Sequence, residues 1–199
     1  IFCQKNNINF YVMYGQTEAS PRMSYLPPKH LLEKTGSIGF PIPGGNFTLI
    51  DELGNIITNN NQIGELVYKG KNVFLGYASS LDDLKKEDEN QNILHTGDLA
   101  KRDSEGFYYI VGRKRRFVKL FGNRLNLDDI ENILKDLNYN SACIGFNDRV
   151  VVYTTKKNVN DKIIDYLSKV TKIHYSAFEI KYIKKIPLTS TGKTNYSKL

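Results

Sequence analysis

The apolar residues in the first half of this chain come in short runs that turn-forming residues separate. Between Gly36 and Gly76, the runs NFTLID and GELVYKG alternate or cluster apolar side chains, and DELGN and NNNQIG lie between them. Strand-length runs bounded by Gly, Asn and Asp are typical of β-strands joined by turns. The thirteen Tyr and ten Phe residues also favour strands. We therefore expect a small sheet or a partial barrel here.

The pattern changes near residue 115, where helical periodicity begins. Residues 126–138 and 161–172 each place apolar side chains on one face of a helix, and Asn126 can cap the first. The two apolar stripes are Leu127, Ile130, Leu134 and Leu137, and Ile163, Ile164, Leu167 and Val170. Strands are expected at residues 117–121, 141–146, 149–155 and 178–186, the middle two forming a hairpin. We expect an α+β fold, with a β-rich part over residues 1–114 and a small α+β domain over 115–199.

Two further segments of the first part contain loops. Residues 9–13, NFYVM, read as a short buried strand that runs into YGQTEASPRMSYLPP, whose prolines prevent a long regular element. Residues 94–106, LHTGDLAKRDSEG, read as a loop and a turn before a strand at residues 107–111. Because loops that follow strands often carry functional residues, both segments are candidates for a site.

Charge and cysteine usage narrow the class of protein without choosing a function. A net charge of +7 and a pI near 9.2 suit nucleic acid, an anionic membrane surface or a nucleotide. No apolar run approaches the roughly 20 residues that span a bilayer, so no membrane span is expected. Cys3 and Cys143 show no metal-ligand or CxxC spacing, which favours a reduced, cytoplasmic protein. Since the first residue is not Met, we expect the chain to begin inside a larger protein.

Four short segments carry the functional interpretation: YGQTE (14–18), TGD (96–98), GRKRRFVKLFGNR (112–124) and LTSTGK (188–193). Each is weak alone, but in this order and at these separations they resemble the motif series of the adenylate-forming superfamily, which includes acyl-CoA synthetases, peptide-synthetase adenylation domains and luciferases. The resemblance covers essentially the whole chain. It implies the C-terminal portion of an enzyme that activates a carboxylic acid with ATP and passes the acyl group to coenzyme A or to the phosphopantetheine of an acyl or peptidyl carrier protein.

The resemblance implies that the YGQTE loop lies over the nucleotide. On this pattern Tyr14 stacks on adenine, Gly15 lets the backbone approach closely, and Gln16 belongs to the same binding loop. Thr17 contacts phosphate as part of the catalytic set, and Glu18 is a ligand to Mg²⁺, for which carboxylate oxygens are suitable. An isolated YGxTE would more often be a surface turn with a half-buried Tyr.

The resemblance assigns Asp98 to the ribose hydroxyls, because a carboxylate can accept two hydrogen bonds from a cis-diol. Arg113 is a second contact on the nucleotide side. Lys193 is the catalytic lysine, able to reach the substrate carboxylate and the α-phosphate. Lys119 and Gly122 complete the cofactor-binding set, with Gly122 beside the channel for the pantetheine arm.

The RKRR run at residues 113–116 also permits other interpretations. Clustered basic residues beside aromatic residues can mark a nucleic-acid-binding face, so a basic nucleic-acid-binding module over residues 113–199 is the alternative function. The family pattern instead makes Arg115 the hinge about which the C-terminal domain rotates, although Asp or Lys is more common there. A catalytically inactive homologue used for assembly is a third possibility, against which Glu18, Asp98 and Lys193 argue.

The segment PLTSTGKT resembles a phosphate-binding P-loop, with Pro187 at the position of its first glycine. That motif requires a following helix whose N-terminal amides bind phosphate. Because only five residues follow Thr194, the P-loop interpretation fails.

The family's Ser/Thr/Gly-rich phosphate loop and its acid pocket normally lie upstream of these motifs, and neither is present in this sequence. The sequence therefore cannot name the acid. Because catalysis requires ATP, acid and Lys193 to be held together, we predict that purified residues 1–199 show no acid-dependent pyrophosphate exchange and bind Mg·ATP weakly or undetectably by calorimetry. Robust exchange by these residues alone would contradict this prediction.

Overall fold

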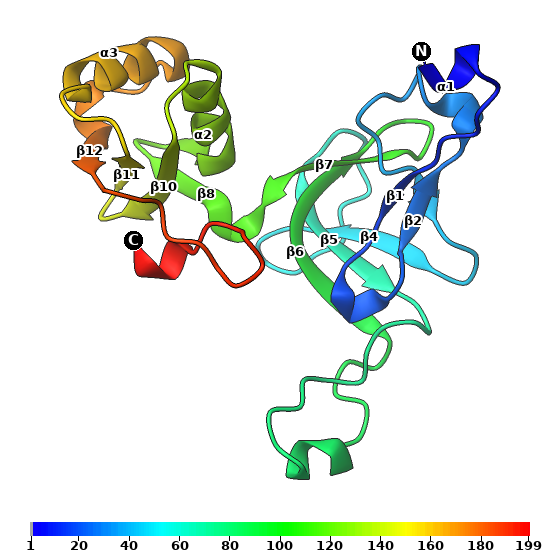
Figure 1. The fold of residues 1–199 in the computed structure, drawn as a ribbon. Helices are drawn as coiled ribbons and strands as arrows, with labels where there is room; N and C mark the ends of the chain where they lie inside the picture. The colour runs from blue at the N-terminus through cyan, green and yellow to red at the C-terminus, as the bar shows by residue number, and fades with distance from the viewer. Residues whose placement is uncertain (1) are drawn as a thin grey trace. The chain divides into compact units, whose positions relative to one another are not determined.

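The computed structural model describes residues 2–199 and divides the chain into two compact units, Ile1–Lys114 and Arg115–Leu199. The boundary falls inside a single 3-10 turn, η4, at Lys114–Arg116. The expected α+β class is confirmed, because a β-rich unit precedes a unit that contains both helices and strands (Figure 1). The sheets in the described part of the chain are open, so the first unit contains sheets and not a closed barrel.

The first unit consists of two antiparallel sheets and a short N-terminal helix, α1 (Phe2–Lys5). A three-stranded sheet has the order β1-β2-β3, and a four-stranded sheet has the order β4-β5-β6-β7. The strands are β1 (Val12–Tyr14), β2 (Ser24–Leu26), β3 (Phe40–Pro41), β4 (Asn46–Ile50), β5 (Gly64–Lys69), β6 (Ile93–Arg102) and β7 (Tyr108–Arg113). Its core clusters aromatic and aliphatic side chains of both sheets around the fully buried Tyr68.

The longest strand of the first unit runs through a segment expected to be a loop. β6 lies between β5 and β7, and it includes the TGD residues, Thr96 to Asp98. Leu94, Thr96 and Asp98 are buried, and His95 and Gly97 between them are more exposed. The prediction was wrong because two of these three buried side chains are polar, so the strand carries no hydrophobic alternation.

The predicted strand at residues 9–13 was also wrong in place and in burial. β1 begins only at Val12, and Phe10, Tyr11 and Met13 are about half exposed, at 49%, 46% and 47%. β1 is at the edge of its sheet and pairs only with β2. Apolar residues on an edge strand need not be buried in this unit, which explains why composition alone misled the prediction.

The second unit packs two helices on one face of a small sheet. Its elements are β8 (Phe117–Leu120), β9 (Asn123–Asn126), α2 (Leu127–Asp136), β10 (Ser141–Phe146), β11 (Arg149–Thr154), α3 (Asn160–Thr171) and β12 (Phe178–Tyr182). β10 and β11 are antiparallel, whereas β11 and β12 are parallel and are connected through α3. Alternate residues of the sheet, including Val150 and Val152, share one core with Ile130 of α2 and Leu167 of α3.

Local signals in the second unit mostly act as expected. The Asn126 side chain accepts a hydrogen bond from the Asp128 amide at 2.9 Å and caps α2. Asn147 and Asp148 form the two-residue hairpin loop with φ values of 47° and 54°, as a type I′ turn requires. Val170, expected on the buried stripe of α3, is 46% exposed, because it lies near the end of the helix. Residues 123–126 form β9, a strand that the sequence pattern does not predict.

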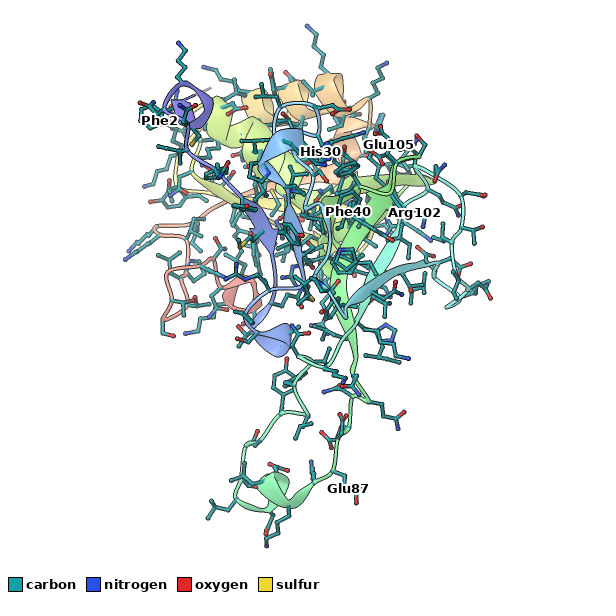
Figure 2. The ribbon with its side chains drawn as sticks, turned by 90° about the vertical axis from the view of Figure 1, so that its right-hand side faces the viewer. Phe2, His30, Phe40, Glu87, Arg102 and Glu105 are labelled. Carbon is teal, nitrogen blue, oxygen red and sulfur yellow. The ribbon has the colours of Figure 1, made fainter. Side chains whose placement is uncertain are left out.

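Residues 70–92 connect β5 to β6, and most of this connection projects from the sheets of the first unit as an arm that contains the 3-10 turn Asp82–Lys85 (Figures 1 and 2). Leu75, Tyr77, Leu81 and Leu84 are largely exposed on this arm. Among residues 2–199, no helix has both the length and the apolar composition needed to cross a membrane.

Candidate functional site

The YGQTE loop is held tightly against the chain that follows it. β1 ends at Tyr14, and Thr17–Ala19 form the 3-10 turn η1. A Cβ atom at Gly15 would lie 2.9 Å from the Arg22 Cα atom and 3.1 Å from the Pro21 carbonyl oxygen. Gly15 therefore lies against the backbone of Pro21 and Arg22, which leaves no room for a side chain at this position.

Asp98 is the centre of the candidate site. Its side chain is only 6% exposed, although it carries a carboxylate. The Tyr14 hydroxyl and the Gln16 side-chain amide donate hydrogen bonds to Oδ2 at 2.5 and 3.0 Å. The Arg113 Nε atom lies 2.6 Å from Oδ1. Both carboxylate oxygens are therefore oriented, and the charge of Asp98 is balanced by a guanidinium.

Residues from three segments meet in these contacts: the YGQTE loop, β6 and the end of β7. The antiparallel register of β6 and β7 places Asp98 directly opposite Arg113. The Gln16 amide also donates to the Thr96 carbonyl at 2.9 Å, which ties the YGQTE loop to β6. The structure therefore brings together four of the predicted nucleotide-binding residues: Tyr14, Gln16, Asp98 and Arg113.

Tyr14 remains a hydrogen-bond donor throughout the physiological pH range. Burial, reinforced by the hydrogen bond to Asp98 and its charge, raises the pKa of the phenol well above its ordinary value. The ring packs edge-on against Phe47, with the ring centroids 6.3 Å apart. Tyr14 thus has a fixed ring as well as a fixed hydroxyl.

Glu18 presents a carboxylate next to Thr17. The Tyr77 hydroxyl donates to Glu18 Oε1 at 2.6 Å, and this bond lowers the pKa of Glu18 below its ordinary value. The Phe74 amide donates to the Glu18 carbonyl at 2.8 Å, which anchors the turn. Residues 2–199 contain no cluster of three or more His, Cys, Asp and Glu side chains arranged for a metal ion. A single carboxylate fits Mg²⁺, which is commonly held by one or two carboxylates together with substrate phosphates and water.

The other predicted residues lie in the second unit. Lys193 is exposed on a loop that an isolated β-bridge between Leu188 and Thr194 closes. Lys119 is exposed on β8. Gly122 lies in the turn between β8 and β9 with a φ of +80° and open space where a Cβ atom would be.

The basic run at residues 113–116 is mostly engaged within the two units. Arg113 pairs with Asp98, and the Lys114 amine lies 2.6 Å from Glu65 Oε2. Arg116 pairs with carboxylates of α2 and is only 12% exposed. Three of the four charges therefore face carboxylates, and no observation supports the nucleic-acid-binding alternative.

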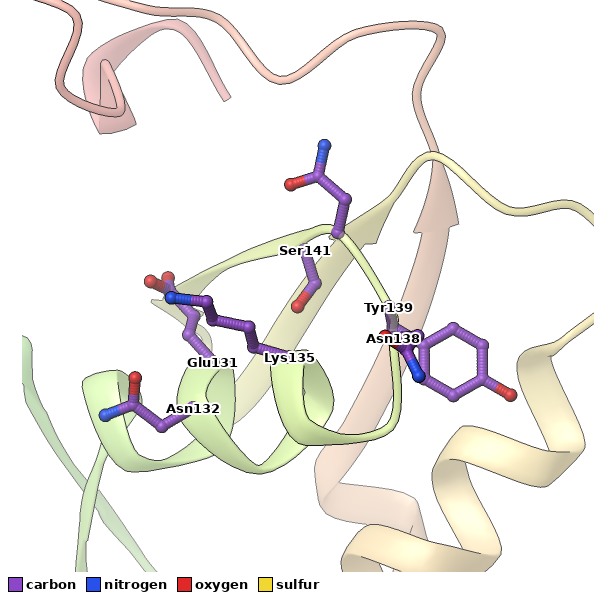
Figure 3. A pocket seen from close by; sticks show the side chains of 7 residues that line it. Glu131, Asn132, Lys135, Asn138, Tyr139 and Ser141 are labelled. Carbon is purple, nitrogen blue, oxygen red and sulfur yellow. The ribbon is translucent and has the colours of Figure 1, made fainter.

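Sequence reasoning missed the groups that orient the predicted residues. Tyr77 carries no motif signal, and its contact with Glu18 joins residues 59 positions apart. A pocket of about 490 Å³ on the second unit was also unexpected (Figure 3). It is lined by Glu131, Asn132, Lys135, Asn138, Tyr139, Asn140 and Ser141, and it includes none of the predicted site residues.

Comparisons with known proteins agree with the motifs. Residues 1–78 match the family model described as AMP-binding enzyme. A 2-succinylbenzoate–CoA ligase of Oceanobacillus iheyensis is 36% identical over 128 residues, which are 64% of this chain and 26% of that protein. A long-chain-fatty-acid–CoA ligase of Salmonella typhimurium is 28% identical over 193 residues, which are 90% of this chain and 33% of that protein.

The fold also matches solved structures. The O-succinylbenzoate coenzyme A synthetase of Bacillus subtilis in complex with AMP superimposes with a TM-score of 0.73 at 21% identity, covering 100% of this chain and 42% of that chain. The structure of the same enzyme with ATP and magnesium ion gives a TM-score of 0.69 at 21% identity, covering 96% of this chain and 41% of that chain. The family model and the curated relatives confirm the resemblance to the adenylate-forming superfamily, and the solved structures confirm the fold. The chain spans only 26% and 33% of the two curated relatives.

The contact of Gly15 with Arg22 and Pro21 generates a prediction about stability. Gly15→Ala should lower the free energy of unfolding by about 1–3 kcal/mol, because the added Cβ atom meets backbone that must move. Urea unfolding of the purified protein measures this change. Thr17→Ala, an exposed position two residues away, is the matched control and should stay within about 0.5 kcal/mol of wild type. Equal stabilities for Gly15→Ala and wild type would show that the loop is not held in this geometry.

Proposed function

We propose that residues 1–199 are the C-terminal portion of an ATP-dependent, AMP-forming acid–thiol ligase. A carboxylate oxygen of the acid attacks the α-phosphorus of ATP and releases pyrophosphate, and a thiolate then attacks the acyl carbon and releases AMP. The observation that carries the proposal is the buried Asp98 carboxylate, which Tyr14, Gln16 and Arg113 hold in place at the meeting point of two family motifs.

The Asp98 group provides a site for the adenosine part of the nucleotide. A carboxylate has about four lone-pair positions, and the protein donors use three of them, so capacity remains for a ribose hydroxyl. Tyr14 offers the edge or face of a fixed ring for adenine, and Gly15 holds the loop close to its own chain. Arg113 adds positive charge on the same side, and its side chain is 57% exposed.

Thr17 and Glu18 are suited to the phosphates and to Mg²⁺. Glu18 is ionised at neutral pH, since its pKa is lowered, and its second oxygen is free of the bond from Tyr77. The bound metal would neutralise phosphate charge during attack at phosphorus. The exposed Thr17 hydroxyl is next in the chain and can donate to a phosphate oxygen.

The division of the chain suits an enzyme whose small domain turns between two half-reactions. We assign residues 1–114 to the end of the large nucleotide-binding domain and residues 115–199 to a mobile C-terminal domain, with Arg115 as the hinge inside η4. Lys193 serves adenylation, in which its ammonium neutralises charge between the acid and the α-phosphate. Lys119 and Gly122 serve the thiol step, in which the pantetheine arm passes Gly122.

The proposed partners are a carboxylic acid and either coenzyme A or a carrier protein. The proposed location is the cytoplasm. Lys and Arg outnumber Asp and Glu by sixteen to eight in residues 115–199. This excess suits the phosphates of coenzyme A as well as an acidic carrier protein. The proposal includes no nucleic-acid partner, because Arg113, Lys114 and Arg116 are already paired with carboxylates.

The role of Asp98 predicts a loss of nucleotide affinity. In the full-length protein, Asp98→Asn should weaken AMP binding by about 10- to 100-fold, because hydrogen bonds to charged groups contribute about 1.5–3 kcal/mol. Calorimetry measures the dissociation constant. Asp82→Asn, which changes an exposed carboxylate on the arm, is the control and should bind AMP like wild type. Unchanged AMP affinity in Asp98→Asn would exclude Asp98 from the nucleotide site.

Because Lys193 is assigned to adenylation and Arg115 to the domain rotation, variants at these two residues of the full-length protein should impair different half-reactions. Lys193→Ala should lower acid-dependent pyrophosphate exchange by about 10²–10³-fold and spare thiol attack on a supplied acyl-adenylate. Arg115→Pro should leave exchange largely intact and impair thioester formation, because proline fixes φ at the hinge. Each variant is the control for the other. Equal loss of both half-reactions in Lys193→Ala would contradict its assigned role, and unchanged activity in Arg115→Pro would place the hinge elsewhere.

A further inference from the structure

The loop that carries Lys193 makes few contacts of its own with the second unit. Residues 188–193 are exposed, and hydrogen bonds within the loop define its shape. The Thr189 amide donates to the Lys193 carbonyl at 2.7 Å, and the Asn195 amide donates to the Pro187 carbonyl at 2.8 Å. These bonds close the loop, but they do not attach it to the sheet or to the helices.

Two residues that flank the loop attach it to the unit. Ile186, before the loop, is buried with 6% exposure. Tyr196, three residues after Lys193, donates its hydroxyl to Glu131 Oε2 on α2 at 2.9 Å. The Tyr153 hydroxyl also donates to the Leu199 carbonyl at 2.8 Å, farther along the tail. Ile186 and Tyr196 are the attachments that lie nearest to the loop on its two sides.

Glu131 is itself fixed by a dense set of partners. Its Oε1 atom accepts a hydrogen bond from the Cys143 amide at 2.7 Å and lies 2.6 Å from the Arg116 guanidinium. Arg116 also donates to the Cys143 carbonyl at 2.6 Å and pairs with Asp128 at 2.7 Å. The carboxylate therefore cannot turn away from Tyr196 without breaking contacts on the other oxygen.

Arg116 also contacts the aromatic ring of Tyr196 directly. The centre of the guanidinium lies 4.0 Å from the Tyr196 ring centroid, a cation–π distance. Burial and the Glu131 charge raise the pKa of the Tyr196 phenol to about 12, so the hydroxyl keeps the proton that it donates. The side chain of Arg116 thus joins α2, β10 and the C-terminal tail.

We infer that Arg116, Glu131 and Tyr196 form a positioning cluster that fixes the direction of the Lys193 loop, so that the lysine is presented to the reacting carboxylate and α-phosphate. The inference rests on the proposed function, since it concerns the adenylation step assigned to Lys193. It gives Arg116, the last residue of the basic run, a positioning role in adenylation that it exerts through Tyr196 and the loop. Displacement of the Lys193 ammonium by about 1 Å would be enough to lower the rate of adenylation strongly.

The test is a double-mutant cycle in the full-length protein, with acid-dependent pyrophosphate exchange as the readout. Tyr196→Phe removes one hydroxyl and leaves the ring beneath Arg116, so the fold should be retained. It should lower exchange about tenfold and spare thiol attack on a supplied acyl-adenylate. In the Lys193→Ala background the same change should have no further effect, because the cluster acts only through the lysine.

Tyr166→Phe, at an exposed tyrosine of α3, is the matched control and should leave exchange unchanged. Wild-type exchange by Tyr196→Phe would overturn the inference. A tenfold loss that persists in the Lys193→Ala background, or an equal loss of both half-reactions, would show a general structural role and would also overturn it. If Lys193→Ala alone exchanged normally, the proposed role of Lys193 would fail first, and this outcome is separate from the others.

Discussion

A carboxylate that is almost completely buried needs hydrogen-bond donors and positive charge around it. The need to place these groups around Asp98 determines how several segments of the first unit are arranged. The donors come from the end of β1, the YGQTE loop and the end of β7. If any of these segments moved away, a charge with 6% exposure would lose a partner. The polar residues of β6 therefore define the site and also connect two sheets that share no strand.

In the second unit, too, a buried charged side chain contacts groups from several segments. Arg116 is 12% exposed, and it is surrounded by two carboxylates, a carbonyl and an aromatic ring. Asp98 holds together the groups of the proposed nucleotide site, whereas Arg116 attaches the segment that contains Tyr196 to α2. The basic run at residues 113–116 divides between these tasks, because Arg113 and Lys114 serve the first unit and Arg116 serves the second.

The sequence predicts those elements whose stabilisation is local. Apolar periodicity and the Asn126 cap predict α2, and Asn147 with Asp148 predicts the hairpin of β10 and β11. β6 was missed because the burial of Thr96 and Asp98 depends on partners from distant segments, which a window of sequence does not contain. The motif series identified Asp98 and Arg113 singly, but their contact follows only from the register of β6 and β7. The Glu131–Tyr196 contact joins residues 65 positions apart and has no sequence signal.

We propose that the protein containing this chain activates a carboxylic acid by adenylation. The most direct measurement is mass spectrometry of the full-length protein incubated without thiol, with Mg·ATP and a panel of acids that includes 2-succinylbenzoate and long-chain fatty acids, the classes named for its relatives. We expect an acyl-adenylate and pyrophosphate with at least one acid, and release of AMP when coenzyme A or a carrier protein is added. Conversion of ATP to ADP and phosphate, with no acyl-adenylate from any acid, would contradict it.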